Sequence, residues 1–102
     1  MPSKLEHHAG QLGALGHPAR LAILRYVVLA GPDGASAGAI QGHVDMPAST
    51  LSHHLTRLVE AGVLRTRGEG TFHYYSAALP ALRQLADYLW GDCCDNGRRS
   101  GS

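Results

Sequence analysis

The chain has 102 residues, 44% of them hydrophobic, and this size predicts a single small domain with a limited core. Nine Lys and Arg against eight Asp and Glu give a formal net charge of +1, which excludes the strongly basic class of non-specific nucleic-acid coat proteins. The sequence has no apolar run near the ~20 residues that cross a bilayer and no signal-peptide pattern, so we expect a soluble, cytoplasmic protein without a membrane partner. Because so small a domain buries only about two-thirds of its surface, a dimer interface would help to stabilise it.

Two helices are predicted at the start of the chain. The first is amphipathic and covers residues 5–15. Its apolar residues are Leu5, Ala9, Leu12 and Leu15. The sequence Gly-His-Pro at 16–18 interrupts it, and Pro18 suits the first turn of a second helix, predicted over residues 20–30. The predicted core face of the second helix consists of Leu21, Ile23, Leu24, Val27 and Val28.

A helix-turn-helix unit is predicted in the middle of the chain. Ser36 is a suitable N-cap for a short helix over residues 37–44. Residues 45–47 turn the chain into a longer helix over residues 48–61, and Gly62 follows as the expected C′ glycine. Two helices joined by three residues match the spacing of a helix-turn-helix.

A β-hairpin and a last helix are predicted after this unit. Residues 63–67 and 71–75 are rich in strand formers, and Gly-Glu-Gly at 68–70 can supply the turn between them. The last helix is predicted over residues 79–92, with an apolar stripe of Leu82, Leu85, Ala86 and Leu89. Residues 95–102 are polar and glycine-rich, so we expect one folded domain over residues 1–94 and a disordered tail.

The helix predicted over residues 48–61 has an apolar and a polar side at ~100° per residue. The apolar side, which would fix the helix to the core, consists of Leu51, Leu55, Leu58 and Val59. The polar side consists of Ser49, His53, Thr56 and Arg57, with Thr50 and Ser52 at its margins. Small hydroxyl side chains can lie flush against a DNA groove while arginine reaches further, so we predict that this side contacts bases and phosphates. His54 lies at the boundary and is predicted to be structural.

The predicted hairpin adds three further DNA-binding candidates. Arg65 and Arg67 lie on one strand and His73 on the other, where cationic side chains suit phosphate or minor-groove contact. A helix, a glycine and a hairpin in this order indicate a recognition helix followed by a β-wing. The alternative is a solvated helix followed by an ordinary hairpin, since helix-turn-helix spacing alone is a weak indication.

Three segments resemble the ArsR (SmtB/ArsR) family of winged-helix repressors. They read LGALGHPARLAILRYV, STLSHHLTRLVEAGVL and RGEGTFHYYS, span about Leu12 to Ser76, and include the fairly specific core S-T-x-S-x-H-L. The resemblance implies a mainly α winged helix-turn-helix with a small β-hairpin, homodimeric through its first and last helices. It also implies repression at a near-palindromic double-stranded DNA operator, relieved by an inducer, with no cofactor required. Pro47 departs from the capping serine of many relatives, so Ser49 or Asp45 is expected to help at this helix start.

The two common metal sites of the family are not matched by this sequence. One needs cysteines in residues 34–43, where there are none. The other uses Asp and His ligands along the last helix, and residues 79–92 contain no histidine. Zinc, cadmium and cobalt are therefore not expected as inducers, which leaves the two cysteines, Cys93 and Cys94.

Cys93 and Cys94 are adjacent, with Cα atoms ~3.8 Å apart, which is less than the ~4.4–6.8 Å of ordinary disulfides. In a reducing cytoplasm such a pair suits soft-metal ligation. The pattern Y-L-x-x-x-C-C from Tyr88 also resembles arsenic-responsive members of the family, in which a third cysteine is often present. Arsenite prefers three thiolates, whereas a trivalent organoarsenical needs only two. Two thiols in one subunit thus favour an organoarsenical on stoichiometry, with arsenite or antimonite as further possibilities.

Several alternatives stay open from the sequence. The cysteine pair could be incidental, leaving a repressor that does not respond to metals, or it could sense oxidants. His7 and His8 could approach the partner subunit's cysteines and form a mixed His/Cys zinc site. A winged helix that docks a protein instead of DNA is less favoured, because such a face would be more apolar. An enzyme is not expected, since Ser52 and His53 have no positioned acid and there is no phosphate loop.

Overall fold

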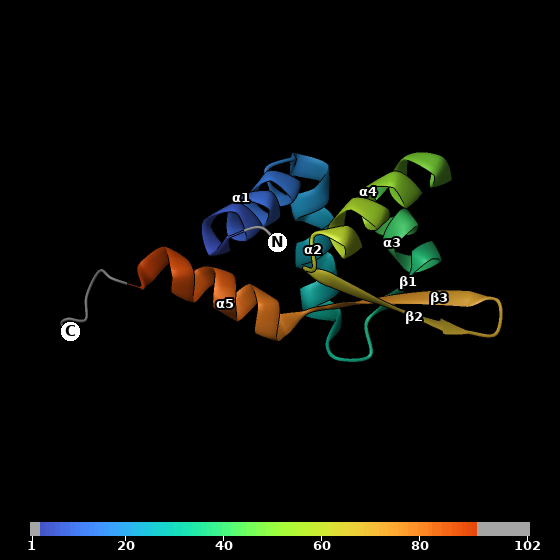
Figure 1. Cartoon of the computed structure of the whole chain (residues 1–102). Coiled ribbons are helices and arrows are strands. Elements are labelled where there is room, and N and C mark those ends of the chain that lie inside the picture. Colours follow the sequence, from blue (N-terminus) through green and yellow to red (C-terminus); the bar gives the residue numbers. More distant parts are fainter. Residues whose placement is uncertain (1–2, 92–102) are drawn as a thin grey trace.

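A computed structural model describes residues 3–91 of the chain (Figure 1). Within this range the chain forms five helices and three strands. In chain order the elements are α1 (Lys4–Leu15), α2 (Pro18–Ala30), β1 (Ala35–Ser36), α3 (Ala37–Val44), α4 (Ala48–Glu60), β2 (Leu64–Glu69), β3 (Phe72–Ala77) and α5 (Leu79–Trp90). The molecule is elongated, 48 × 25 × 24 Å, because the β2–β3 hairpin and α5 extend in opposite directions from the helices between them (Figure 1).

The helix starts follow from local capping. Ser3 and Glu6 form a capping box at α1, and the Nδ1 atom of His17 accepts from the Ala19 N–H at 3.3 Å at the start of α2. The Ser36 hydroxyl accepts from the Ala39 N–H at 3.1 Å, which confirms it as the N-cap of α3. At α4 the N-cap is Pro47, and no side chain supplies a capping hydrogen bond. The expected help from Ser49 or Asp45 is therefore absent.

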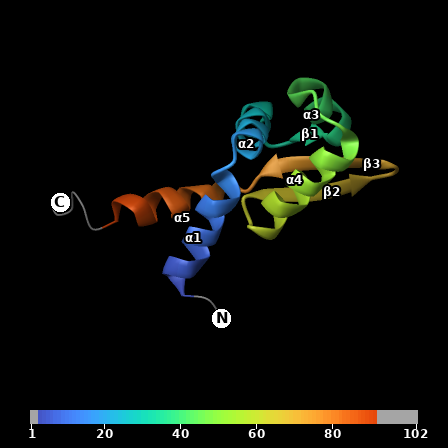
Figure 2. The ribbon, with the colours of Figure 1, turned by 90° about the horizontal axis from the view of Figure 1, so that it is seen from above.

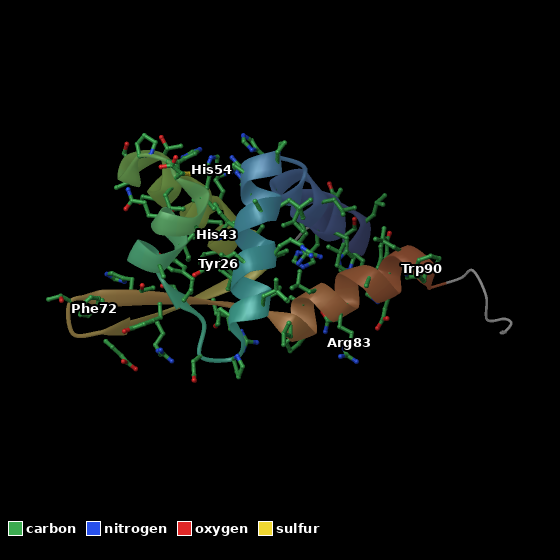
Figure 3. The ribbon with its side chains drawn as sticks, turned by 180° about the vertical axis from the view of Figure 1, so that it is seen from behind. Tyr26, His43, His54, Phe72, Arg83 and Trp90 are labelled. Carbon is green, nitrogen blue, oxygen red and sulfur yellow. The ribbon has the colours of Figure 1, made fainter. Side chains whose placement is uncertain are left out.

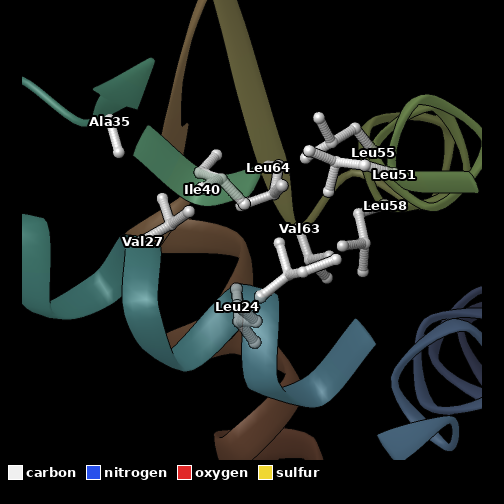
Figure 4. Packing of buried hydrophobic residues seen from close by; sticks show 10 residues of the cluster. Leu24, Val27, Ala35, Ile40, Leu51, Leu55, Leu58, Val63 and Leu64 are labelled. Atoms are coloured by element: carbon white, nitrogen blue, oxygen red, sulfur yellow. The ribbon is translucent and has the colours of Figure 1, made fainter. Parts of the chain in front are cut away.

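The core lies between α2, α3, α4 and the base of the sheet (Figure 4). Its fully buried apolar side chains are Ile23, Val27, Ile40, Leu58 and Val63. Burying each such side chain contributes about 1.5–3 kcal/mol relative to leaving it in water. The core therefore fixes α4 against α2 and the first residues of the wing, which is the arrangement that the helix-turn-helix pattern predicts.

The sheet has three antiparallel strands in the order β1-β3-β2. The β2–β3 hairpin runs from the pair Leu64–Ala77 to the pair Glu69–Phe72, so only Gly70 and Thr71 form its tip. The predicted turn at 68–70 is wrong, because Gly68 and Glu69 continue strand β2. A two-residue turn needs positive φ, and Gly70, at φ 61°, supplies it.

Three helices differ from prediction in the residues they bury. In α2, Leu21 and Val28 belong to the predicted core face but are 48% and 40% exposed. In α1, Leu5, Ala9 and Leu12 of the predicted apolar side are exposed, while Leu15 is partly buried against the core. The buried residues of α1 are His8, Gln11 and Ala14. In α5, which ends at Trp90 rather than at residue 92, only Leu85 of the predicted stripe is fully buried. The exposed apolar residues of α1 and α5 are Leu5, Leu12, Leu79, Tyr88, Leu89 and Trp90.

The helices of residues 3–91 are all too short or too polar to cross a bilayer.

Candidate DNA-binding surface

The turn between α3 and α4 is set by backbone conformation. Asp45 ends α3 in the left-handed region, at φ 51° and ψ 61°, and its N–H donates to the Gln41 carbonyl. The Gln41 side-chain amide reaches across the turn and donates to the Met46 carbonyl at 3.1 Å. These two contacts direct the chain through Pro47 into α4.

Helix α4 is fixed by one side and exposed on the other. Leu51, Leu55 and Leu58 are buried in the core, as predicted, and Val59 is partly buried beside them. The six predicted DNA-binding residues of this helix are all exposed; they are Ser49, Thr50, Ser52, His53, Thr56 and Arg57. These side chains thus cover one continuous outer side of α4. The helix itself lies across the base of the hairpin (Figure 2).

The hairpin places the three predicted wing residues on two different faces. Side chains alternate between the faces of a strand, and Arg67 is opposite Tyr74 in the β2–β3 pairing while Thr66 is opposite Tyr75. The face with Thr66 and Tyr75 packs toward α4, and His73 belongs to it. Arg65 and Arg67 belong to the other face, away from α4.

The structure brings His73 together with helix α4. A hollow of about 240 Å³ is lined by Ser52 from α4, Gln41 from α3 and His73 from β3, together with their apolar neighbours. A second hollow of about 170 Å³ joins Thr56 of α4 to Thr66 of the wing. Ser52, Thr56 and His73 therefore form one polar surface that runs from helix to wing.

Arg67 has partners within the wing itself. Its Nε atom lies 3.5 Å from a carboxylate oxygen of Glu69, and its guanidinium lies 4.9 Å from the centre of the Tyr74 ring. Both partners are exposed or half-buried, so the contacts are weak and screened by solvent. The Glu69 carboxylate nevertheless places a negative charge near the hairpin tip, where it opposes approach to phosphates.

Arg57 is on the opposite edge of α4 from the wing. It lines a hollow of about 300 Å³ between α1 and α4, together with Glu6, His7 and Glu60. Two carboxylates, those of Glu6 and Glu60, thus line the same hollow as Arg57. The candidate surface is therefore broad and only mildly basic, as the net charge of +1 leads one to expect.

His54 joins α4 to the start of α2. Its Nδ1 atom accepts a hydrogen bond from Arg20 Nε–H at 3.0 Å, and its ring centre is 4.9 Å from that of His17. Burial lowers the pKa of His54, and the positive charges of Arg20, then His17 and His53, lower that pKa further. His54, labelled in Figure 3, is thus a buried acceptor for Arg20, which confirms the structural role predicted for it.

Sequence reasoning missed Arg20 as the partner of His54. A signal was present, because Arg20 is the third residue of α2, where the helix dipole disfavours a cation. A cation in that position indicates a partner from another element. The pairing of residues 34 apart could be found only in the folded chain.

The predicted inducer residues Cys93 and Cys94 lie outside the described residues. Between residues 3 and 91, no cluster of three or more His, Cys, Asp or Glu side chains is arranged to hold a metal ion. Of the two N-terminal histidines, His7 is exposed but His8 is only 7% exposed, so His8 is not the solvated side chain that its position suggests.

The helix-turn-helix arrangement of this chain is also found by comparison with known proteins. A helix-turn-helix domain family matches residues 15–67. The HTH-type transcriptional regulator YgaV of Escherichia coli is 33% identical over 94 residues, which cover 92% of this chain and 93% of YgaV.

Two solved structures share the fold. The homodimeric winged helix-turn-helix DNA-binding domain of Mb0332 from Mycobacterium bovis, a possible ArsR-family regulator, has 28% identity, a TM-score of 0.69, and coverage of 87% of this chain and 85% of that one. The transcriptional repressor BigR from Xylella fastidiosa has 29% identity, a TM-score of 0.64, and coverage of 84% and 85%. The chain therefore belongs to the helix-turn-helix family of transcriptional regulators and is an ArsR-type winged-helix regulator.

Proposed function

We propose that this protein is a homodimeric transcriptional repressor that binds operator DNA through α4 and its wing. The observation that carries this proposal is the division of α4, whose leucines are buried while its hydroxyl groups, the His53 imidazole and the Arg57 guanidinium are exposed. A helix held in this way can enter the major groove without rearranging the core. The matching proteins named above are regulators, a DNA-binding domain and a repressor, which supports the assignment.

The roles on DNA follow from reach and chemistry. Ser49, Thr50, Ser52, His53 and Thr56 suit base edges and nearby phosphates, and Arg57 suits a phosphate at the edge of the groove. His73 continues this surface onto the wing. Arg65 and Arg67, on the other face of the hairpin, suit the backbone beyond the wing or the adjacent minor groove.

Dimerisation would involve α1 and α5. Leu5 and Leu89 are 65% and 59% exposed, and Trp90 is 69% exposed at the far end of α5 (Figure 3). These helices pack on one another, and α5 extends away from the core (Figure 1), so their exposed apolar side chains are available to a second copy. Mb0332 is homodimeric with the same fold, which supports this arrangement. Two copies would present two α4 helices to a near-palindromic operator.

The inducer that fits this chain best is a trivalent arsenical bound by Cys93 and Cys94, with no other cofactor required. Helix α5 ends at Trp90, so two thiols follow shortly after the helix proposed to form the dimer. An organoarsenical needs two thiolates, which one subunit has; arsenite or antimonite would need a third ligand. Thiol oxidation is the second candidate signal, because adjacent thiols are also a redox-sensitive group.

Titration of a preformed operator complex tests this function. Fluorescence anisotropy of a labelled promoter fragment would follow release by arsenite, a methylarsenical, antimonite, zinc and a thiol oxidant in separate titrations. We expect release by the methylarsenical at the lowest concentration, and Cys93→Ser should bind DNA normally but resist release. Release of Cys93→Ser at wild-type concentrations would contradict the cysteine assignment, while release by the oxidant alone would establish the redox alternative.

A further inference from the structure

Helix α1 buries two polar side chains, His8 and Gln11, on the side that faces the rest of the chain, where apolar side chains are usual. Gln11 is 2% exposed and His8 is 7% exposed, while Leu5 and Leu12 of the same helix face solvent. Glutamine and histidine are rarely buried to this degree unless each polar atom has a partner. The partners of these two side chains therefore indicate what the pair is for.

The contacts of Gln11 fix the arrangement of the pair. Its Nε2 group donates to the Ala61 carbonyl at 3.4 Å, and its Oε1 atom lies 2.9 Å from Nδ1 of His8. A carbonyl can only accept, so the amide nitrogen must face Ala61 and the amide oxygen must face His8. Nδ1 of His8 is then the donor in this hydrogen bond, and the Gln11 amide oxygen is the acceptor.

Ala61 is the residue at which the recognition helix ends. Its own N–H donates to the Arg57 carbonyl at 3.0 Å, and the next two N–H groups, of Gly62 and Val63, donate back to Val59 and Leu58 at 2.9 and 3.2 Å. Carbonyls in the last turn of a helix have no partner within the helix. The Gln11 amide, on α1, supplies a donor for the Ala61 carbonyl at the point where α4 passes into the wing.

The other end of the pair reaches α5. The ring centre of His8 lies 4.5 Å from that of Tyr88, with 34° between the ring planes. A continuous series of contacts thus runs from Tyr88 through His8 and Gln11 to Ala61. These contacts join α1 and α5, which expose apolar side chains, to the C-terminal end of α4, which exposes a polar side.

We propose that Gln11 is a positioning residue for DNA recognition, which holds the C-terminal end of α4 against α1 and is itself oriented by His8. The inference rests on the proposed function, because it assigns a role in operator binding. It adds that the position of α4 depends on the packing of α1 and α5, and hence that the dimer and the DNA-reading helix are coupled through two buried polar side chains.

Three variants and one control separate this role from simple stabilisation. Gln11→Met keeps the length of the side chain but neither accepts from His8 nor donates to Ala61. His8→Phe keeps a ring against Tyr88 but loses the donor to Gln11, and His7→Phe is its matched control at the exposed neighbouring position. The double variant with both Gln11→Met and His8→Phe replaces both partners by apolar groups, a change that can restore stability.

Two measurements are needed, one with DNA and one without. For Gln11→Met and the double variant we expect about tenfold weaker operator binding, unchanged binding to non-specific DNA, and an unchanged salt slope, because no phosphate contact is removed. In the DNA-free protein the amides of Ala61, Gly62 and Val63 should exchange about tenfold faster. His7→Phe should match the wild type in both measurements.

The outcomes distinguish failure of the positioning role of Gln11 from failure of the proposed function. If the double variant regains wild-type operator affinity along with its stability, or if exchange at the end of α4 is unchanged, Gln11 has no positioning role. If the wild type fails to prefer its operator, the proposed function fails. In that case the exchange measurement still decides whether Gln11 holds the end of α4.

Discussion

Helix α4 and the pair α1 and α5 use amphipathic sequences in opposite ways. In α4 the leucines face the core of their own chain, and the polar residues other than His54 face outward. In α1 the order is reversed, since Gln11 and His8 are inside while Leu5 and Leu12 are outside. An apolar stripe therefore predicts burial, but it does not show whether the same chain or a partner chain covers the stripe.

This difference assigns the two regions distinct roles. The outward side of α4 can meet a polar, charged partner, which DNA provides. The exposed apolar side chains of α1 and α5 suit an apolar partner surface, and we propose that a second copy of the same helices provides it. The contacts through His8 and Gln11 lie between these regions and link them.

The largest effect is expected when a buried leucine of α4 and an exposed leucine of α5 are each replaced by alanine. Leu58 is fully buried and Leu89 is 59% exposed. Leu58→Ala should lower the free energy of unfolding by about 3 kcal/mol at any protein concentration. Leu89→Ala should lower it by about 1 kcal/mol, and only through the dimer, so the loss should vary with concentration. Chemical denaturation at several protein concentrations checks both; a concentration-independent loss for Leu89→Ala would contradict the proposed interface.

A second prediction compares two exposed arginines. Arg57→Ala should weaken operator binding by about 1–2 kcal/mol, roughly tenfold, and should lower the salt slope by about two per dimer, because each protomer would neutralise one phosphate fewer. Arg83, which projects from α5 (Figure 3), is the matched control, and Arg83→Ala should leave both quantities unchanged. Binding isotherms at several salt concentrations provide the measurement. Equal effects at the two positions would show that α4 is not the DNA-contacting helix.

A smaller effect is expected at the wing. Glu69 pairs with Arg67 at 3.5 Å and adds a negative charge near the hairpin tip. Glu69→Gln should strengthen DNA binding by about twofold, since exposed ion pairs contribute only ~0.2–1 kcal/mol. Competition between the variant and the wild type for one operator fragment can resolve this difference. Weaker binding by the variant would mean that Glu69, rather than Arg67, makes a favourable contact at the wing.

The sequence predicted the elements well because their ends are fixed locally. Ser36 caps α3 and Gly62, at φ 81°, follows α4, as their residue types indicate. The orientation of α1 was not predictable, because periodicity does not reveal whether Leu12 meets its own core or a partner. The division of the wing residues between two faces depends on register, and the hairpin tip begins at Gly70 rather than at Gly68.

The smallest effect concerns pH and His54. Its folded-state pKa is lowered by burial and by Arg20, so the folded protein resists protonation more than the unfolded chain does. Stability from this group is present above the unfolded pKa of about 6.5 and decreases as pH falls below it, because the unfolded chain takes up the proton first. His54→Gln, which can still accept from Arg20, should flatten the decrease in Tm below that pH. An unchanged pH profile would contradict the neutral state assigned to His54.

The most direct test of the central claim, that α4 reads operator DNA in a dimer, is a comparison of two labelled DNA fragments by fluorescence anisotropy. One fragment carries the promoter upstream of the gene, and the other has the same composition in shuffled order. We expect two protomers to bind each promoter site, with an affinity at least ~1000-fold above that for the shuffled fragment. Equal affinity for the two fragments, or binding of a single protomer, would contradict the claim.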